Sequence, residues 1–286
     1  SGTIVVPSLA TRISIDGGAL TLTGGMTLSA ATTVGGIGNM TVSGTKITGT
    51  SSLTKDGNGV LTLSADNDYT GTTTLNAGAL NLTGNHTGTG ALTINGGTMV
   101  ISGGSGAIAS AAGITIGGGG ALTLDNTVEN NGNRLKDSGN FTMNGGTLNF
   151  NINTNSGTFS ESGGALVVNS GANVLNCQQA ASGQSNVLTF ASYARTAGAS
   201  VDFVGEGIGD GTGRNKIVIT GQGDDTRLAG ATVNGMYEAW YDIAGGKGVY
   251  GKDLTYTNID ARAGGTYPDI PDGSNLNVRI ASDGVA

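Results

Sequence analysis

Short runs of alternating apolar and polar residues recur along most of this chain, separated by glycine, asparagine and aspartate. Residues 53–82 show the pattern most clearly, with three such runs at 60–63, 72–75 and 79–82. Strict alternation predicts half-buried β-strands, and Gly or Asn/Asp corners tolerate the positive φ that a sharp bend requires. A unit this short cannot bury its apolar face alone. Repeated units of this kind are therefore expected to stack as a solenoid.

Runs of this kind continue at short intervals from the start of the chain to about residue 176. With two or three strands in a coil of roughly 20 residues, this part would hold about eight coils. Nowhere does the 3.6-residue apolar period of an amphipathic helix appear. The pattern therefore predicts an all-β solenoid that forms a single elongated domain.

The composition changes from about residue 186, while the strand pattern persists. Most aromatic residues lie at or after Phe190, among them Trp240, the one tryptophan of the chain. We therefore expect regular coils over residues 1–185, and over residues 186–286 a continuation with larger coils that includes the inter-subunit end. A separate capping domain is the competing interpretation of the second part.

The composition excludes several classes of protein. Only 12% of the residues are charged, which argues against charge-driven disorder. The net charge is −7 and Lys and Arg form no cluster, so the basic stripe of a nucleic-acid-binding protein is absent. No apolar stretch reaches the ~18 residues of a membrane span. Cys177, the one cysteine, cannot form an intramolecular disulfide, and we expect it to be buried.

One segment fills a specific family pattern, Leu-x-Lys-x-Gly-x-Gly-x-Leu-x-Leu-Ser followed by Asn-x-Tyr-x-Gly-x-Thr and Gly-x-Leu. The residues that fill it are Leu53, Lys55, Gly57, Gly59, Leu61, Leu63, Ser64, Asn67, Tyr69, Gly71, Thr73, Gly78 and Leu80. Residues 53–82 thus resemble the passenger-associated strand repeat of autotransporters. Residues 186–203, 214–219 and 231–241 are similar, more loosely, to later coils of very long repeat-containing bacterial surface proteins. The resemblance implies a right-handed parallel β-helix, export to the cell surface and a stalk or adhesive role.

Both ends of the chain resemble strands without a polar cap, at residues 3–15 and 275–281. A bare solenoid end exposes unpaired backbone groups and an open core, which terminal coils normally cover. Stacking the last coil of one chain on the first coil of the next would cover both ends, and such contacts repeat without closing. We therefore expect a head-to-tail filament. The strands expected at this contact contain Ile4, Val5, Val6, Val278 and Ile280.

Paired acidic residues are the first candidates for catalysis, because glycoside hydrolysis needs two carboxylates beside a sugar-binding cleft. The pairs are Asp66/Asp68, Asp224/Asp225 and Asp269/Asp272. We favour a role in turns, where Asx side chains normally bond to the backbone. His86, the one histidine, lies in a polar corner and is expected at the surface. No catalytic residue is therefore expected.

A calcium site is a weaker hypothesis. Residues 221–225 approximate part of a calcium-binding nonapeptide, with Asp224 and Asp225 as candidate ligands. Such a site needs a successive copy to complete its oxygen shell, and the chain has none. Asp210, in Gly-Ile-Gly-Asp-Gly, is a near miss with different spacing. We expect no metal and no cofactor.

The aromatic group Tyr237, Trp240 and Tyr241 is the best candidate for a ligand surface, since exposed aromatic rings stack on sugars. The alternative, which we favour, is that these rings fill a wider coil or cover its mouth.

Together these features predict a non-enzymatic structural or adhesive β-solenoid on the bacterial cell surface, repeated end to end in a filament or stalk. Its expected partners are other copies of itself and surface glycans, with no nucleic acid and no membrane insertion by this chain. The alternative is a carbohydrate-binding or glycan-degrading β-helix protein, which would need acidic or basic side chains aligned on neighbouring coils.

Overall fold

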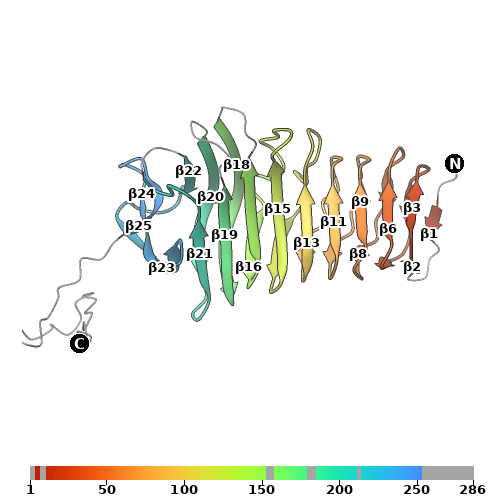
Figure 1. Ribbon diagram of the computed structural model, residues 1–286, viewed down its shortest axis with the longest axis horizontal. Helices are drawn as coiled ribbons and strands as arrows, with labels where there is room; N and C mark the ends of the chain where they lie inside the picture. Colours follow the sequence, from red (N-terminus) through yellow and green to blue (C-terminus); the bar gives the residue numbers. More distant parts are fainter. Residues whose placement is uncertain (1–3, 7–10, 153–157, 179–184, 211–213, 253–286) are drawn as a thin grey trace, which may run out of the picture. The chain divides into compact units, whose positions relative to one another are not determined.

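The computed structural model (Figure 1) describes residues 4–6, 11–152, 158–178, 185–210 and 214–252. The chain divides into two units, residues 1–251 and 252–286, and all of the second except Lys252 lies outside the described residues. The described part consists of strands, turns and bends without an α-helix, which confirms the all-β prediction. It therefore contains no helix long and apolar enough to cross a membrane.

Three sheets contain the strands of the described part. The ten-stranded sheet has the order β2 (Thr11–Ile15), β5 (Thr32–Gly36), β8 (Leu53–Lys55), β10 (Thr73–Leu75), β12 (Leu92–Ile94), β14 (Gly113–Gly117), β16 (Asn140–Asn144), β18 (Thr158–Ser170), β20 (Ser185–Arg195) and β22 (Asn215–Ile219). The twelve-stranded sheet has the order β3 (Ala19–Leu22), β6 (Asn39–Val42), β9 (Val60–Leu63), β11 (Ala79–Leu82), β13 (Gly97–Ile101), β15 (Gly120–Asn126), β17 (Thr147–Ile152), β19 (Ala172–Gln178), β21 (Ser200–Val204), β23 (Thr226–Val233), β24 (Tyr237–Asp242) and β25 (Gly248–Lys252). The three-stranded sheet has the order β1 (Ile4–Val6), β4 (Met26–Leu28) and β7 (Ile47–Gly49).

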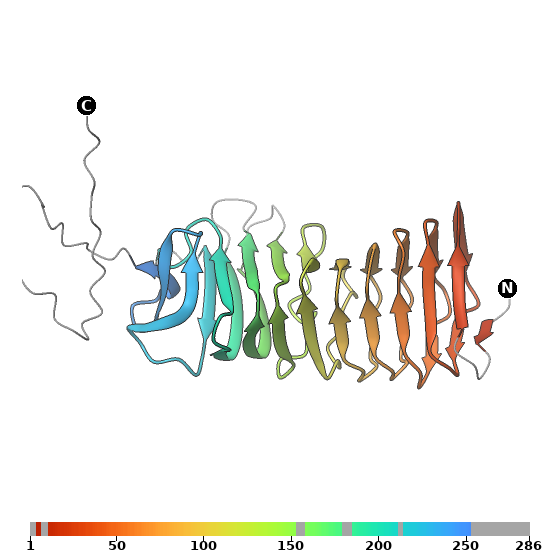
Figure 2. The ribbon, with the colours of Figure 1, turned by 90° about the horizontal axis from the view of Figure 1, so that it is seen from below.

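From β1 to β23, successive strands belong to different sheets, so the backbone winds around and returns one strand further along. Every pair of neighbours in the ten-stranded sheet is parallel. Figures 1 and 2 show the resulting coils in order along one axis. Eight strands of this sheet, β2 to β18, begin before residue 176, in agreement with the eight coils expected there. The predicted parallel β-helix, a β-solenoid, is confirmed.

Parallel register stacks equivalent residues of successive coils into an inward-facing ladder. In the twelve-stranded sheet this ladder consists of Leu20, Met40, Leu61, Leu80, Met99, Leu122, Leu148, Leu175, Phe203 and Val233. Every member except Leu20 is buried. Thr62 lies between two inward residues and faces outwards, because successive side chains of a strand point to opposite sides. Burying one apolar side chain in such a ladder stabilises the fold by about 1.5–3 kcal/mol.

Cys177 belongs to a neighbouring ladder of the same sheet. It pairs with Phe150 and is fully buried, which confirms the expected burial. Burial raises the pKa of its thiol to about 12. The thiol therefore stays protonated at neutral pH and packs as a small apolar group.

Coil length increases along the chain. Leu61 pairs with Leu80, 19 residues later, and Leu122 pairs with Leu148, 26 residues later. Phe203 pairs with Val233, 30 residues later. Residues 186–252 thus hold the longest described coils, and the increase begins before them.

The parallel order ends at β23. β24 runs antiparallel to it, with Tyr237 opposite Val233 and Tyr241 opposite Thr226. β25 follows β24 as the last strand of the twelve-stranded sheet. Ala239 and Tyr241 of β24 and Val249 of β25 are all buried. We call β24 and β25 the closing strands, because they cover the core after the last parallel coil.

Candidate functional site

The first coil, formed by β2 and β3, is incompletely covered. Each of these strands stands first in its sheet and has a neighbouring strand on one side only in the described part. Their inward residues Ile13, Leu20 and Leu22 are only partly buried. Met40 and Val42, which pair with the two leucines one coil further on, are buried. The first coil thus combines strand edges with a half-exposed apolar face.

Two of the predicted contact strands can be compared with the structure only in part. Ile4, Val5 and Val6 form β1, which pairs in parallel with β4 and stands first in its sheet. The strand expected there is confirmed, and its contact with another copy stays a prediction. Val278 and Ile280 lie outside the described residues.

The closing strands contain the aromatic residues expected at a ligand surface. Tyr241 is only 1% exposed, and its hydroxyl accepts a hydrogen bond from the backbone N–H of Ile219 at 3.2 Å. Ile219 ends β22, the last described strand of the ten-stranded sheet. Tyr241 therefore covers a strand end and is not available to a ligand. Tyr237 is 38% exposed, and Trp240 is half-buried.

Lys55, the lysine of the passenger-type repeat, is buried at an inward position of β8 with only 2% exposure. Its ammonium donates hydrogen bonds to the carbonyl oxygens of Asp56, Gly57 and Ala77 at 2.7–3.2 Å. Burial lowers the pKa of the ammonium, and the charge of Asp56 opposes this shift. The lysine thus joins the corner of one coil to the corner of the next.

The glycines of that corner are required by its backbone. Gly57 has a φ of +71°, a conformation that L side chains rarely adopt. A Cβ on Gly59 would lie 1.9 Å from the carbonyl oxygen of Gly38 in the preceding coil. The Gly-x-Gly element of the repeat therefore allows close stacking of corners.

The remaining polar residues of the repeat also satisfy groups inside the coil. The Asn67 carbonyl oxygen accepts the N–H of Ile47 at 2.8 Å, and its amide donates to the carbonyl of Ala65 at 2.6 Å. Tyr69, buried at 1% exposure, shares a 2.6 Å hydrogen bond with the hydroxyl of Thr73. These residues stabilise the stack and form no open site.

His86 is buried, so the predicted surface position is wrong. A parallel bridge aligns it with Asn67 of the preceding coil, which places its ring inside with 6% exposure. Nδ1 lies 3.1 Å from the carbonyl oxygen of Asn67, and the ring packs against Tyr69 with centroids 4.4 Å apart. Burial lowers the pKa of the imidazole.

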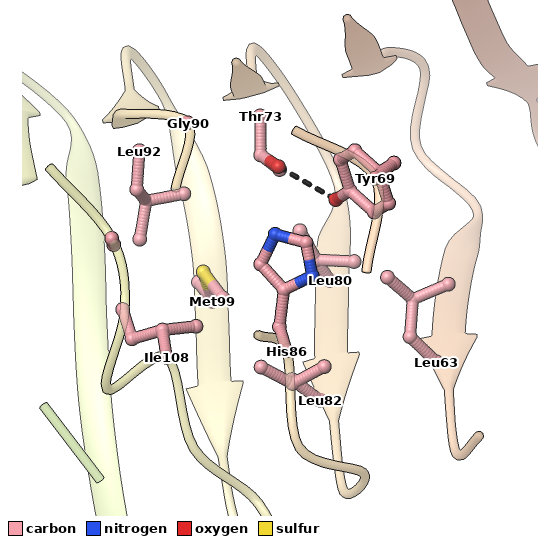
Figure 3. Close-up of a pocket in the computed structure, with 11 residues that line it drawn as sticks. Leu63, Tyr69, Thr73, Leu80, Leu82, His86, Gly90, Leu92, Met99 and Ile108 are labelled. Atoms are coloured by element: carbon pink, nitrogen blue, oxygen red, sulfur yellow. Dashed lines mark hydrogen bonds between the residues drawn. The ribbon is translucent and has the colours of Figure 1, made fainter. Parts of the chain in front are cut away.

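Figure 3 shows this ring among apolar neighbours that include Leu80 and Met99. The cavity beside it has a volume of about 20 Å³. A single water needs about 10–15 Å³, so the cavity is too small for an organic ligand. The interior around His86 is therefore not a substrate site.

The first acidic pair is engaged in local contacts. Asp68 forms a 2.5 Å ion pair with Lys46, and Asp66 accepts the backbone N–H of Asn85 at 2.7 Å. These contacts join neighbouring coils at a corner. The pair that lies outside the described residues is Asp269/Asp272.

The calcium candidates do not form a ligand cluster. Asp224 accepts the backbone N–H groups of Ile243 and Ala244 at 2.6 and 3.2 Å, which ties it to the turn after β24. Asp225 has a φ of 48°, typical of Asx residues in turns. In the parts of the chain that the structure describes, no three His, Cys, Asp or Glu residues gather, so Asp210 does not join Asp224 and Asp225 in such a group.

A buried arginine holds the loops on one side of the solenoid. Arg134 is fully buried, and its guanidinium donates five hydrogen bonds of 2.7–3.1 Å. The acceptors are Asn126 Oδ1 and the carbonyl oxygens of Gly103, Gly106, Asp125 and Glu129. We call this arrangement the Arg134 clamp. It joins two loops that leave successive strands of the twelve-stranded sheet, β13 and β15.

Glu161 anchors the clamp from the next coil. It is 1% exposed, and its carboxylate accepts the backbone N–H groups of Arg134, Leu135 and Ser162 at 2.8–3.4 Å. Burial raises the pKa of this carboxyl to about 7, while the three N–H groups oppose the shift. Arg134 and Glu161 are both used inside the fold.

The two clamped loops border a hollow of about 280 Å³ on the outside of the coils. We call it the polar hollow, and the polar and backbone groups around it belong to Asp66, Asn85, Gly104, Ser105, Asn131 and Asn133. The Asn131 amide donates to the carbonyls of Gly104 and Gly106 at 3.2 Å, and its oxygen accepts the N–H of Asn133 at 2.9 Å. Asn131 thus fixes the rim of the hollow.

Neither the Arg134 clamp nor the polar hollow is evident from strand patterns. Their residues lie in non-repeating loops and meet only when coils stack. One signal was present: Arg134 follows an Asn-rich stretch at 130–133 in an unusually long gap between apolar runs. A lone cation in such a gap is consistent with a residue that organises loop carbonyls.

Comparison with known proteins supports the repeat. The family model described as Passenger-associated-transport-repeat matches residues 53–82 and 77–101. The first match is the segment identified from its sequence, and the second overlaps it and contains His86. No curated protein and no solved structure matches the chain.

The two repeats and the β-solenoid fit an autotransporter passenger β-helical repeat protein, so the resemblance found in the sequence is confirmed. Such repeats suggest a secreted or cell-surface protein. The repeats themselves cover only residues 53–101, where their polar residues serve the stacking of coils.

Proposed function

We propose that this chain is a non-enzymatic structural and adhesive element of the bacterial cell surface, extended end to end into a stalk or filament. The observation that carries the proposal is the uncovered first coil, where Leu20 is the only partly buried member of an otherwise buried ladder. Strand edges and an apolar face together favour the addition of further β-coils.

A second copy of the chain is the proposed occupant, in a head-to-tail arrangement. The first coil of one copy would meet the closing strands of the next, where β25 is the last strand of its sheet in the described part. Such a contact is heterologous and repeats without closing, so it builds a fibre. Continuous hydrogen bonding along its axis would then resist extension and proteolysis.

The absence of catalysis is part of the same proposal. The buried titratable side chains are engaged in structural contacts: Lys55 with corner carbonyls, His86 with Asn67, and Glu161 with backbone N–H groups. General acid–base chemistry needs such groups beside a substrate. Their engagement inside the coils supports a mechanical role.

Assembly can be tested with the full chain by sedimentation velocity and negative-stain imaging over a range of concentrations. The wild type is expected to form end-to-end rods that lengthen with concentration. Leu20→Asp places a charge on the proposed contact and should leave monomers. Ile37→Asp is the matched control, because Ile37 is 70% exposed at a corner and should not affect assembly.

Two results would contradict this account. One is a wild type that stays monomeric at every concentration, as expected if an earlier coil of a longer chain covers the first coil. The other is a set of rods that forms equally well with Leu20→Asp.

A further inference from the structure

We infer that the polar hollow binds a neutral, hydroxyl-rich group, such as one sugar residue of a surface glycan. This inference deepens the adhesive part of the proposed function by giving it a location and a ligand class. It places sugar recognition away from the closing strands, where Tyr241 is buried.

The hollow contains hydrogen-bonding groups that the fold does not use. The side chains of Asn85, Ser105 and Asn133 make no hydrogen bond within the described residues, although each borders the hollow. Asp66 accepts one N–H through Oδ1, which leaves its second oxygen facing solvent or a ligand. Two amides, a hydroxyl and a carboxylate supply both donors and acceptors, as vicinal hydroxyl groups require.

The charge and shape of the hollow select among polar ligands. Asp66 lies in its wall, and the carboxylate of Glu129 accepts the N–H of Gly104 at its rim, so anionic groups are repelled. Ala107 and Ala109 add an apolar surface that can contact the carbon face of a sugar ring. The described residues supply too few acidic groups here for a divalent cation site.

The hollow is also rigidly built. The Arg134 clamp holds the loops that carry Gly104 and Asn131, and Asn131 itself bonds to two carbonyls of the neighbouring loop. Groups held in place before binding lose little conformational freedom when a ligand arrives. The volume of about 280 Å³ is close to the lower end of small-molecule sites, ~300 Å³, and suits one sugar residue.

Saturation-transfer NMR on the full chain provides the test. The probes are glucose, galactose, mannose and N-acetylglucosamine, with glucuronate as the anionic comparison, all in the presence of EDTA. We expect saturation transfer to at least one neutral sugar, at least fivefold weaker binding of glucuronate than of glucose, and the same result in Leu20→Asp. Binding that persists in Leu20→Asp separates this inference from the assembly proposal.

The variant Ser105→Ala/Asn133→Ala should lower the affinity at least tenfold while leaving the fold intact, because neither side chain bonds within the described structure. Asn58→Ala is the matched control, since Asn58 is an exposed corner residue away from the hollow. Three results would overturn the inference: no transfer to any neutral sugar, equal binding by the double variant, or binding that EDTA abolishes.

Discussion

The two ends of the described solenoid differ in how their cores are covered. At the first coil, Leu20 and Leu22 are only partly buried, and β2 and β3 have neighbours on one side. At the other end, Tyr241 and Val249 of the closing strands are buried, and the Tyr241 hydroxyl covers the N–H of Ile219. One rule of parallel stacking therefore ends in two different ways.

The difference shows what each coil requires. An interior coil has a neighbour on each side, so its inward residues lose contact with water completely. The chain covers one end with a strand that reverses direction, while the first coil has no such strand in the described part. The uncovered end is where a partner would remove the most apolar surface from water.

The largest expected effect comes from placing the same charge at both positions of one ladder. Leu61→Asp buries an unpaired carboxylate between two coils and should destabilise the protein by more than about 4 kcal/mol, or prevent folding. Leu20→Asp should reduce stability by about 1 kcal/mol, because its side chain already contacts water. Urea denaturation of both variants measures the difference, and similar losses would contradict an open first coil.

The next effect concerns the Arg134 clamp, which belongs to the interior. Arg134→Met removes five hydrogen bonds and should destabilise the protein by about 3–5 kcal/mol, since buried carbonyls lose their donors. Arg227→Met is the control, because Arg227 pairs with Glu238 at an exposed site and should change stability by about 1 kcal/mol or less. Equal losses in thermal or urea denaturation would mean that the clamp is not a stabilising element.

The smallest effect is the pH dependence of an interior coil. Burial lowers the pKa of His86, so below pH 6.5 the unfolded chain binds a proton before the folded protein does. Stability should therefore be fully present above pH 6.5 and fall as the pH drops towards the lowered pKa, by at most about 1.4 kcal/mol per pH unit. His86→Gln should reduce the loss between pH 7.5 and pH 5.5 in urea denaturation. An unchanged loss would exclude His86 as its cause.

Much of the fold could be predicted from the sequence, because each strand carries a local signal. Alternation around Leu61 and Leu80, together with glycine corners, identifies the strands and their stacking. Residues that the repeat pattern specifies, such as Lys55, could be located in the coil, but their burial could not. A lysine in a strand is ordinarily solvent-exposed, and only the stacked carbonyls of neighbouring corners compensate for its burial.

The reversal of β24 and the polar hollow could not be predicted for a different reason. Tyr237, Trp240 and Tyr241 alternate like any strand, and alternation does not distinguish a parallel neighbour from an antiparallel one. The hollow joins Asp66 to Asn133, which become neighbours only when several coils of unequal length stack. Local patterns contain no information about such contacts between loops.

The most direct test of the central claim is hydrogen exchange of the backbone amides in β2 and β3 as a function of protein concentration. Copies that stack on the first coil should protect these amides increasingly as concentration rises, towards the protection of β9, while β9 itself stays unchanged. Exchange in β2 and β3 that is fast and independent of concentration would contradict assembly through the first coil.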